Sequence, residues 1–152
     1  QDLCNNGGSL ASINSTEGVL YAEFKVFDSD NSYKMIEIND GSSSNNRVVL
    51  YVYGSNIFGF IKSNGNTNLN VFSAETVTNF NKVAIKWGSV DTALWVNGVE
   101  INTGTASTFT QNILSDLSFL GAGNQYFFGK TKALAVWKEA LSDSELQSLT
   151  TI

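Results

Sequence analysis

The sequence has neither histidine nor proline, and it has a single cysteine, Cys4. Histidine is the most frequent general base and a frequent metal ligand in enzymes, so serine or cysteine triads that depend on it are excluded. A lone cysteine excludes a disulfide within the chain. The apolar runs stay far below the roughly 20 residues that a membrane-spanning helix requires, which predicts no membrane insertion.

Charge is scarce as well, since charged residues make up 15% of the chain and the formal net charge is −5. Binding of nucleic acid needs a basic surface, so this composition predicts no nucleic-acid partner. Apolar residues make up 42% of the 152 residues, which is enough for the core of one domain, 1–152. The chain starts abruptly at Gln1 without a secretory signal, and we therefore expect the C-terminal module of a longer protein.

Two alternating apolar runs occupy the middle of the chain, at residues 81–101. A polar loop joins them and an Asn-Gly turn follows, so they are predicted to pair as antiparallel strands. Pairing across the loop sets Ile85 opposite Leu94 on the core face. The same register turns Trp95 to the other face, over the small Ala84.

Turn signals separate further alternating stretches at intervals of roughly 8–12 residues, the spacing of an antiparallel sandwich. The predicted strands are Gly18–Phe27, Tyr33–Asn39, Arg47–Tyr53, Ile57–Lys62, Leu69–Ala74, Leu117–Leu120 and Tyr126–Trp137. Only the C-terminus is typical of a helix, because Ser142 and Glu145 have the spacing of a capping box. The predicted fold class is all-β, an antiparallel two-sheet β-sandwich with one short C-terminal helix.

Two motifs carry a family resemblance. The order KVAIKW, polar loop, LWVNG resembles the corresponding hairpin of laminin-G-like, concanavalin A-like jelly rolls. The stretch FFGKTKALAVWKEALSDSELQSL resembles the closing motif of the same family, and Phe127, Gly129 and Glu145 are among the matching residues. Lys132 departs from the pattern, because many members have aspartate there, and Thr131 replaces an aliphatic residue. The resemblance implies a jelly roll of the lectin/glucanase superfamily.

Residues 14–23, the same hairpin and the ending ELQSLTTI are also similar to C-terminal jelly-roll domains of bacteriophage tail and virion proteins. This similarity implies an extracellular or virion-surface location, with oligomerisation through the parent chain. Its motifs are mostly structural, and a fold does not by itself fix a function.

Hydrolysis of a glycosidic bond requires two carboxylates, typically about 5–9.5 Å apart. The acidic pairs nearest in sequence are Asp28 with Asp30 in a predicted loop, and Asp143 with Glu145 in the helix cap. No strand carries the alternating carboxylates of retaining enzymes with this fold. We therefore predict a non-catalytic domain, with a polysaccharide-degrading enzyme as the remote alternative.

Carbohydrate sites combine an aromatic ring with amide and charged groups in a shallow site. Trp95 is the best platform because its register turns it outward, whereas Trp87 and Trp137 are predicted to lie in the core. The other candidates share a predicted strand face or adjacent turns, namely Tyr51, Tyr53, Arg47, Asn56, Asn64 and Asn66. Together they predict binding of a polysaccharide or other glycan. Packing against a neighbouring strand or subunit is the alternative for these aromatic residues.

Calcium is a candidate cofactor, because it prefers six to eight oxygen ligands and two predicted loops offer several. Asp28, Asp30 and Asn31 lie in the first loop, and Asp40 lies with Asn39 in the second. Loops of this composition are also typical of ordinary turns.

Two functions remain open from the sequence. The first is a lectin-like carbohydrate-binding module on a phage particle or a secreted protein, with avidity from multiple copies. The second is a structural, oligomerisation or decoration domain of a virion, in which exposed aromatic residues contact neighbouring chains.

Overall fold

The computed structural model describes residues 2, 4, 7–41, 44–121 and 125–152. Two five-stranded antiparallel sheets make up most of this part of the chain. One has the order β12 (Gly129–Trp137), β1 (Gly18–Val26), β6 (Asn81–Trp87), β7 (Thr92–Val96), β8 (Val99–Gly104). The other has the order β5 (Asn66–Ala74), β4 (Asn56–Ser63), β3 (Arg47–Tyr53), β2 (Lys34–Asn39), β9 (Asp116–Ser118).

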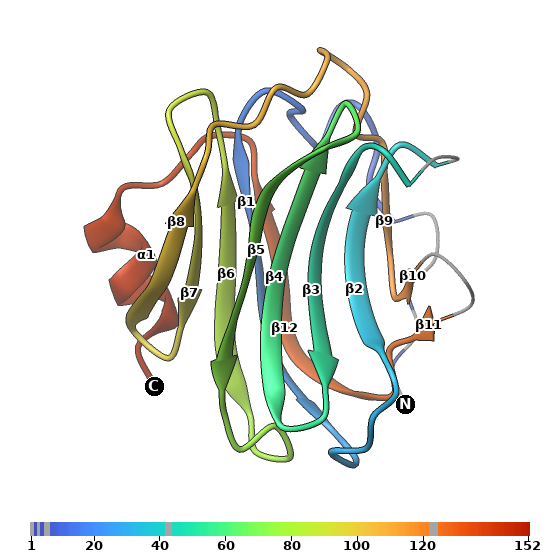
Figure 1. The fold of residues 1–152 in the computed structure, drawn as a ribbon, viewed down its shortest axis with the longest axis vertical. Coiled ribbons are helices and arrows are strands. Elements are labelled where there is room, and N and C mark those ends of the chain that lie inside the picture. Colours follow the sequence, from blue (N-terminus) through green and yellow to red (C-terminus); the bar gives the residue numbers. More distant parts are fainter. Residues whose placement is uncertain (1, 3, 5–6, 42–43, 122–124) are drawn as a thin grey trace.

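The two sheets lie face to face, and a short two-stranded ribbon of β10 (Leu120–Gly121) and β11 (Gln125–Tyr126) lies at one side (Figure 1). The helix α1 (Asp143–Thr150) packs on the outer side of the first sheet, beside β6, β7 and β8. We call the first sheet the helix-side sheet and the second the aromatic sheet, for the side chains described below. The predicted all-β sandwich with one short C-terminal helix is confirmed.

The core lies between the sheets and follows the period of two along each strand. Buried inward-facing residues include Leu20, Phe24, Ile36, Ile38, Leu50, Ile57, Ile61, Ile85, Trp87 and Leu94. Trp87 is fully buried among them and donates its indole N–H to the carbonyl of Asn14 at 3.1 Å. The assignment of Trp87 to the core is confirmed.

The central hairpin of β6 and β7 has the predicted register, with Ile85 opposite Leu94 and Ala84 opposite Trp95. Asn97 and Gly98 close the next turn with φ of 51° and 83°. Two positive φ angles in sequence are the signature of a type I′ turn, which Asn-Gly adopts readily. This turn leads into β8, at the edge of the helix-side sheet.

Two predictions about the C-terminal half are wrong. The expected strand from Tyr126 to Trp137 is interrupted, because the backbone N–H of Phe127 donates to Phe119 at 2.8 Å and its ring packs 5.7 Å from Phe24. Trp137 is half-buried on the outer face instead of in the core, since it pairs with Val19 in an outward register.

The helix begins where the capping box predicts. The Ser142 side chain accepts a hydrogen bond from the Glu145 backbone, and the Glu145 carboxylate accepts one from the Ser142 backbone at 2.8 Å. The Ser142 hydroxyl also donates to the Glu145 carboxylate at 2.6 Å, and this bond, together with the one from the Ser142 backbone, lowers the pKa of Glu145. Among the residues that the structure describes, no helix is long and apolar enough to cross a membrane.

Candidate functional site: the outer face of the aromatic sheet

Strand β3 turns two of the predicted binding tyrosines to the same side. Tyr51 and Tyr53 alternate with the buried Leu50 and Val52, so they point away from the core on the outer face of the aromatic sheet. Arg47 lies in the same register at the start of the strand. The predicted placement of these three side chains on one face is confirmed.

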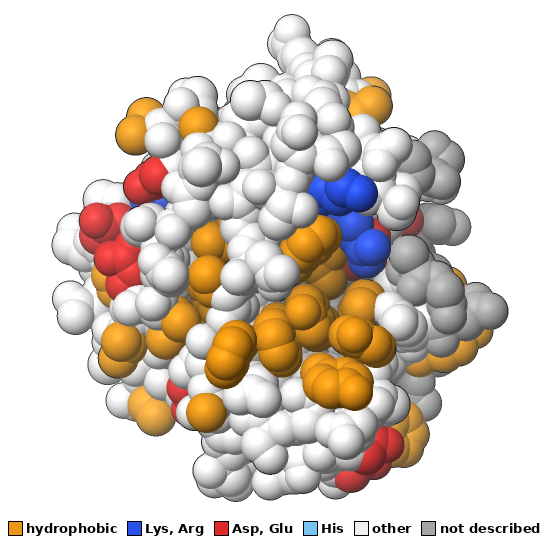
Figure 2. Space-filling view, viewed as in Figure 1, with side chains coloured by type: hydrophobic (Ala, Val, Ile, Leu, Met, Phe, Trp, Pro, Cys, Tyr) orange, Lys and Arg blue, Asp and Glu red, His pale blue; other side chains and the backbone are white. Residues whose placement is uncertain are grey.

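Aromatic rings from neighbouring strands continue this face into a row. The row consists of Tyr33, Tyr51, Tyr53, Phe58 and Phe72, and each ring contacts at least one other. It crosses the sheet because Tyr51 pairs with Phe58 of β4, which pairs with Phe72 of β5. Figure 2 shows the apolar side chains gathered on this face, with basic side chains beside them. We call these five residues the aromatic row.

The rings of the aromatic row differ in how much of each face is free. Tyr51 and Phe58 stack with their centroids 4.5 Å apart and their planes 5° from parallel. Phe72 lies at the end of the row, 5.2 Å from Phe58, and is 57% exposed. A sugar ring needs an open aromatic face or edge, so the end at Phe72 and the outer edges of the row are the accessible parts.

A basic corner lies on the same face, above the row. Arg47 pairs across the ladder with Lys62, and its guanidinium forms an ion pair with the buried carboxylate of Glu37. The Nε atom of Arg47 is buried and has no hydrogen-bond partner among the described residues. Of the two cations in this corner, Lys62 has no ion pair to a described residue.

The phenol of Tyr51 stays protonated at neutral pH. Burial raises its pKa, the neighbouring Tyr33 adds to the shift, and Arg47 opposes it. A neutral phenol both donates and accepts hydrogen bonds, as recognition of sugar hydroxyls requires.

The structure separates the three predicted asparagines. Asn56 pairs with Tyr53 at the start of β4, within the aromatic part of the face. Asn64 follows the other end of β4, roughly 25 Å away at the rise of an extended strand. There Asn64 contacts the backbone carbonyl of Thr108, which fastens a loop. Asn66 begins β5 at this same distant end.

Trp95 does not offer an exposed ring, and that expectation is wrong. Its register is as predicted, but helix α1 covers the outer face there and leaves Trp95 only 6% exposed. It packs in a second apolar cluster with Tyr21 and Leu146. Trp95 is therefore a packing residue of the helix-side sheet.

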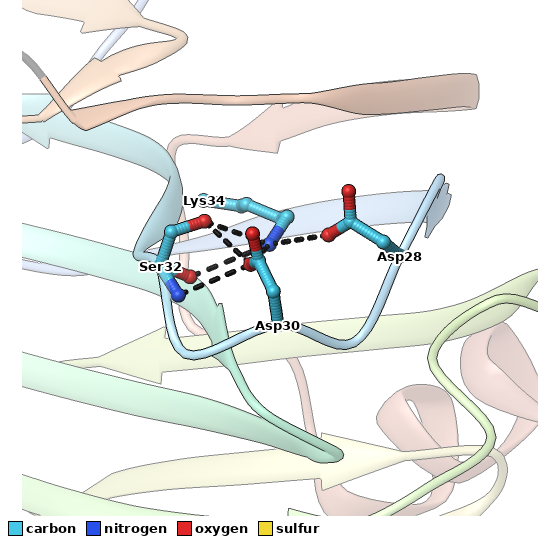
Figure 3. Close-up of polar contacts among 4 residues, drawn as sticks. All are labelled: Asp28, Asp30, Ser32 and Lys34. Atoms are coloured by element: carbon cyan, nitrogen blue, oxygen red, sulfur yellow. Dashed lines mark hydrogen bonds and ion pairs between the residues drawn. The ribbon is translucent and has the colours of Figure 1, made fainter.

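The predicted calcium ligands do not fit an open cation site. Figure 3 shows the ammonium group of Lys34 between Asp28 and Asp30, with the Asp28 contact at 2.9 Å. The hydrogen bond from Lys34, with a smaller contribution from Ser32, holds the pKa of Asp30 well below its usual range. Asn31 lies in the same loop, whereas Asp40 accepts a hydrogen bond from Asn46 in the next.

Within the described part of the chain, no group of three His, Cys, Asp or Glu residues is placed to hold a metal ion. A buried lysine already supplies the positive charge between Asp28 and Asp30, so these carboxylates do not offer an open calcium site. Dialysis against a chelator is expected to leave the melting temperature unchanged.

Several residues of the face escaped the sequence interpretation, notably Tyr33, Phe58, Lys62 and Phe72. Their strands do carry the signal, because Phe58 and Lys62 alternate with buried isoleucines along β4. What the sequence pattern left open was the register that brings β4 and β5 beside β3.

The family model of the concanavalin A-like lectin/glucanases superfamily matches residues 12–147. The chain belongs to this superfamily. The predicted family resemblance is confirmed. No curated protein matches the sequence.

Solved structures with the same fold cover nearly the whole chain. The CBM40 of the Ruminococcus gnavus IT-sialidase, bound to α2,3-sialyllactose, is 18% identical with a TM-score of 0.73, covering 100% of this chain and 97% of that one. The leech intramolecular trans-sialidase is 21% identical with a TM-score of 0.73, covering 100% of this chain and 27% of that one. A heptameric SAP-like pentraxin from Limulus polyphemus is 16% identical with a TM-score of 0.68, covering 94% and 72%. At these identities the comparisons show the fold.

Proposed function

We propose that this domain is a non-catalytic carbohydrate-binding module that binds a glycan on the outer face of the aromatic sheet. The observation that carries the proposal is the aromatic row, a set of contacting rings left uncovered across three strands and the loop before β2. Exposed aromatic rings beside polar groups are the usual composition of a sugar site. The superfamily also contains lectins, which supports the proposal.

The glycan lies, in this proposal, with an apolar sugar face on the open side of Phe72. Its hydroxyl groups reach the phenols of Tyr51 and Tyr53 and the amide of Asn56. Arg47 and Lys62 give the other part of the face positive charge, which favours a sugar with a carboxylate. Sialyllactose, the ligand named for the R. gnavus CBM40, is therefore a sensible first probe.

The absence of catalysis is part of the proposal. Glu37 is buried against Arg47, so its carboxylate is engaged and does not face a glycosidic bond. We further propose an extracellular setting, where such glycans are found. The phage or virion origin suggested by sequence similarity stays a prediction.

A glycan array that includes α2,3- and α2,6-sialyllactose and neutral oligosaccharides tests the proposal. The domain is expected to bind at least one class without cleaving it, and Tyr51→Ala is expected to weaken that binding. Tyr126→Ala is the matched control, because Tyr126 is 53% exposed and forms no ring contact with the row. Equal losses in both variants, or no binding to any glycan, would contradict the proposal.

The oligomerisation alternative predicts a different result for the same face. If the aromatic row joins copies of the chain, the wild-type domain sediments as an oligomer and Phe72→Ala as a monomer. A wild-type monomer that binds glycan separates the two functions.

A further inference from the structure

The helix-side sheet carries a second surface with charged side chains, on its outer face next to the C-terminal end of helix α1. Four lysines gather there on three neighbouring strands, and we call them the lysine patch: Lys25, Lys82, Lys130 and Lys132. They are four of only nine basic residues in a chain of net charge −5. Their concentration on one face gives that face a local excess of basic side chains.

The strand register places these charges against one another. Lys25 of β1 stands directly opposite Lys130 of β12, and Glu23 stands opposite Lys82 of β6. Like charges directly opposite each other destabilise a sheet. The Lys25–Lys130 pair therefore does not stabilise the sheet, in contrast to the opposite charges of Glu23 and Lys82.

The acidic residues at the patch are fewer than the lysines. Glu23 pairs with Lys132 at 2.9 Å, and Asp2 lies 3.9 Å from Lys130. Lys82 donates to the backbone carbonyl of Thr151 at 2.8 Å, which leaves its charge unneutralised. The net charge of these described residues is therefore positive.

Phe80 lies beneath two of the ammonium groups. The Nζ atoms of Lys25 and Lys132 are 5.3 Å and 5.2 Å from the centre of its ring. The cation–π contact holds both side chains near the ring.

We propose that the lysine patch binds a polyanionic glycan, one with carboxylate or sulfate groups repeated along its chain. Strand-borne cations stand roughly 5 Å apart across the ladder and 6–7 Å apart along a strand, so they present a fixed row to a repeating charge. The patch lies on the opposite sheet from the aromatic row. The two surfaces can therefore hold two glycan segments at once and add avidity.

Dextran sulfate and uncharged dextran are suitable probes, compared by calorimetric titration at increasing salt. The wild-type domain is expected to bind only dextran sulfate, more weakly as salt rises because exposed charges are screened. Lys25→Gln and Lys130→Gln are each expected to lower the affinity about fivefold, the contribution typical of one lysine near an anionic surface. Lys138→Gln is the control, since it removes one exposed lysine elsewhere.

Three outcomes would overturn the proposal. One is an equal loss in Lys138→Gln, which would mean that net charge alone governs binding. Another is unchanged affinity in a Lys25→Gln/Lys130→Gln variant that melts like the wild type. The third is binding to phosphatidylserine vesicles without binding to dextran sulfate, which would assign the patch to a membrane. Phe72→Ala is expected to keep dextran sulfate binding. A failure of the lysine-patch proposal is therefore distinguishable from a failure of the aromatic-row site.

Discussion

The two sheets have similar inner faces and different outer faces. On the helix-side sheet, an eight-residue helix covers the outward-facing Trp95 and leaves it 6% exposed. On the aromatic sheet, the rings of the aromatic row contact one another and stay open, with Phe72 57% exposed. An outward strand register is therefore necessary for an aromatic binding residue but does not suffice. Whether such a ring is accessible depends on whether a distant part of the chain folds over it.

Each sheet also holds a buried lysine between two aspartates. Lys34 lies between Asp28 and Asp30 at the end of the aromatic sheet. Lys86 of the helix-side sheet lies 2.9 Å from Asp91 and 3.5 Å from Asp143, the first residue of the helix. Lys34 holds the loop before β2 in place, whereas Lys86 attaches helix α1 to the helix-side sheet.

The largest effect is expected from Trp95→Ala. Truncating a buried tryptophan should lower the free energy of unfolding by about 3–5 kcal/mol, because it removes the apolar contacts beneath the helix and leaves a cavity. Urea denaturation measures this. Glycan affinity of the folded variant is expected to stay unchanged, and a selective loss of binding without loss of stability would reverse the roles assigned to the two faces.

Phe72→Ala should produce the opposite pattern. We expect an affinity loss of about tenfold for a glycan that the array identifies, in keeping with one lost aromatic contact. The free energy of unfolding should change little, since the ring is mostly exposed. Calorimetric titration beside a denaturation curve measures both quantities, and a large destabilisation with intact binding would make the row a packing feature.

Ser142→Ala tests how firmly helix α1 is held over Trp95. Loss of the N-cap should lower the free energy of unfolding by about 1 kcal/mol and loosen the helix over Trp95. Tryptophan emission should shift to longer wavelength as the ring gains contact with water. Ser148→Ala, on the exposed side of the same helix, is the control. Equal stability and equal emission wavelength in the two variants would show that the capping box does not hold helix α1 over Trp95.

The smallest effect is expected on the loss of stability at acidic pH. Lys34 lowers the pKa of Asp30 in the folded state. The stability that this pair contributes is therefore complete above the ordinary aspartate pKa of about 4, and it is lost as the pH falls through the lower folded value. Melting temperatures between neutral and strongly acidic pH should fall less steeply for Asp30→Asn than for the wild type. Parallel curves would argue against the pair.

The sequence was sufficient for much of the fold because alternation and turn residues act locally. The register of Ile85 with Leu94 follows from one loop, and the capping box of Ser142 and Glu145 follows from four residues. The two-sheet sandwich and its short helix could be predicted on that basis.

The candidate site could be predicted only in part. Tyr51, Tyr53 and Arg47 share one strand, so their common face follows from the period of two. The contribution of Phe72 depends on a register across three strands, and the burial of Trp95 depends on a helix that begins 48 residues later. Neither can be read from the local pattern.

Fluorine NMR of the domain with 3-fluorotyrosine, and separately with 5-fluorotryptophan, shows directly which sheet holds the glycan. All three tryptophans lie on strands of the helix-side sheet, whereas Tyr33, Tyr51 and Tyr53 belong to the aromatic row. Saturation with a bound glycan is expected to shift the resonances of these tyrosines and to leave the tryptophan resonances in place. A shift of the Trp95 resonance with unchanged tyrosine resonances would contradict the assignment of the site to the aromatic sheet.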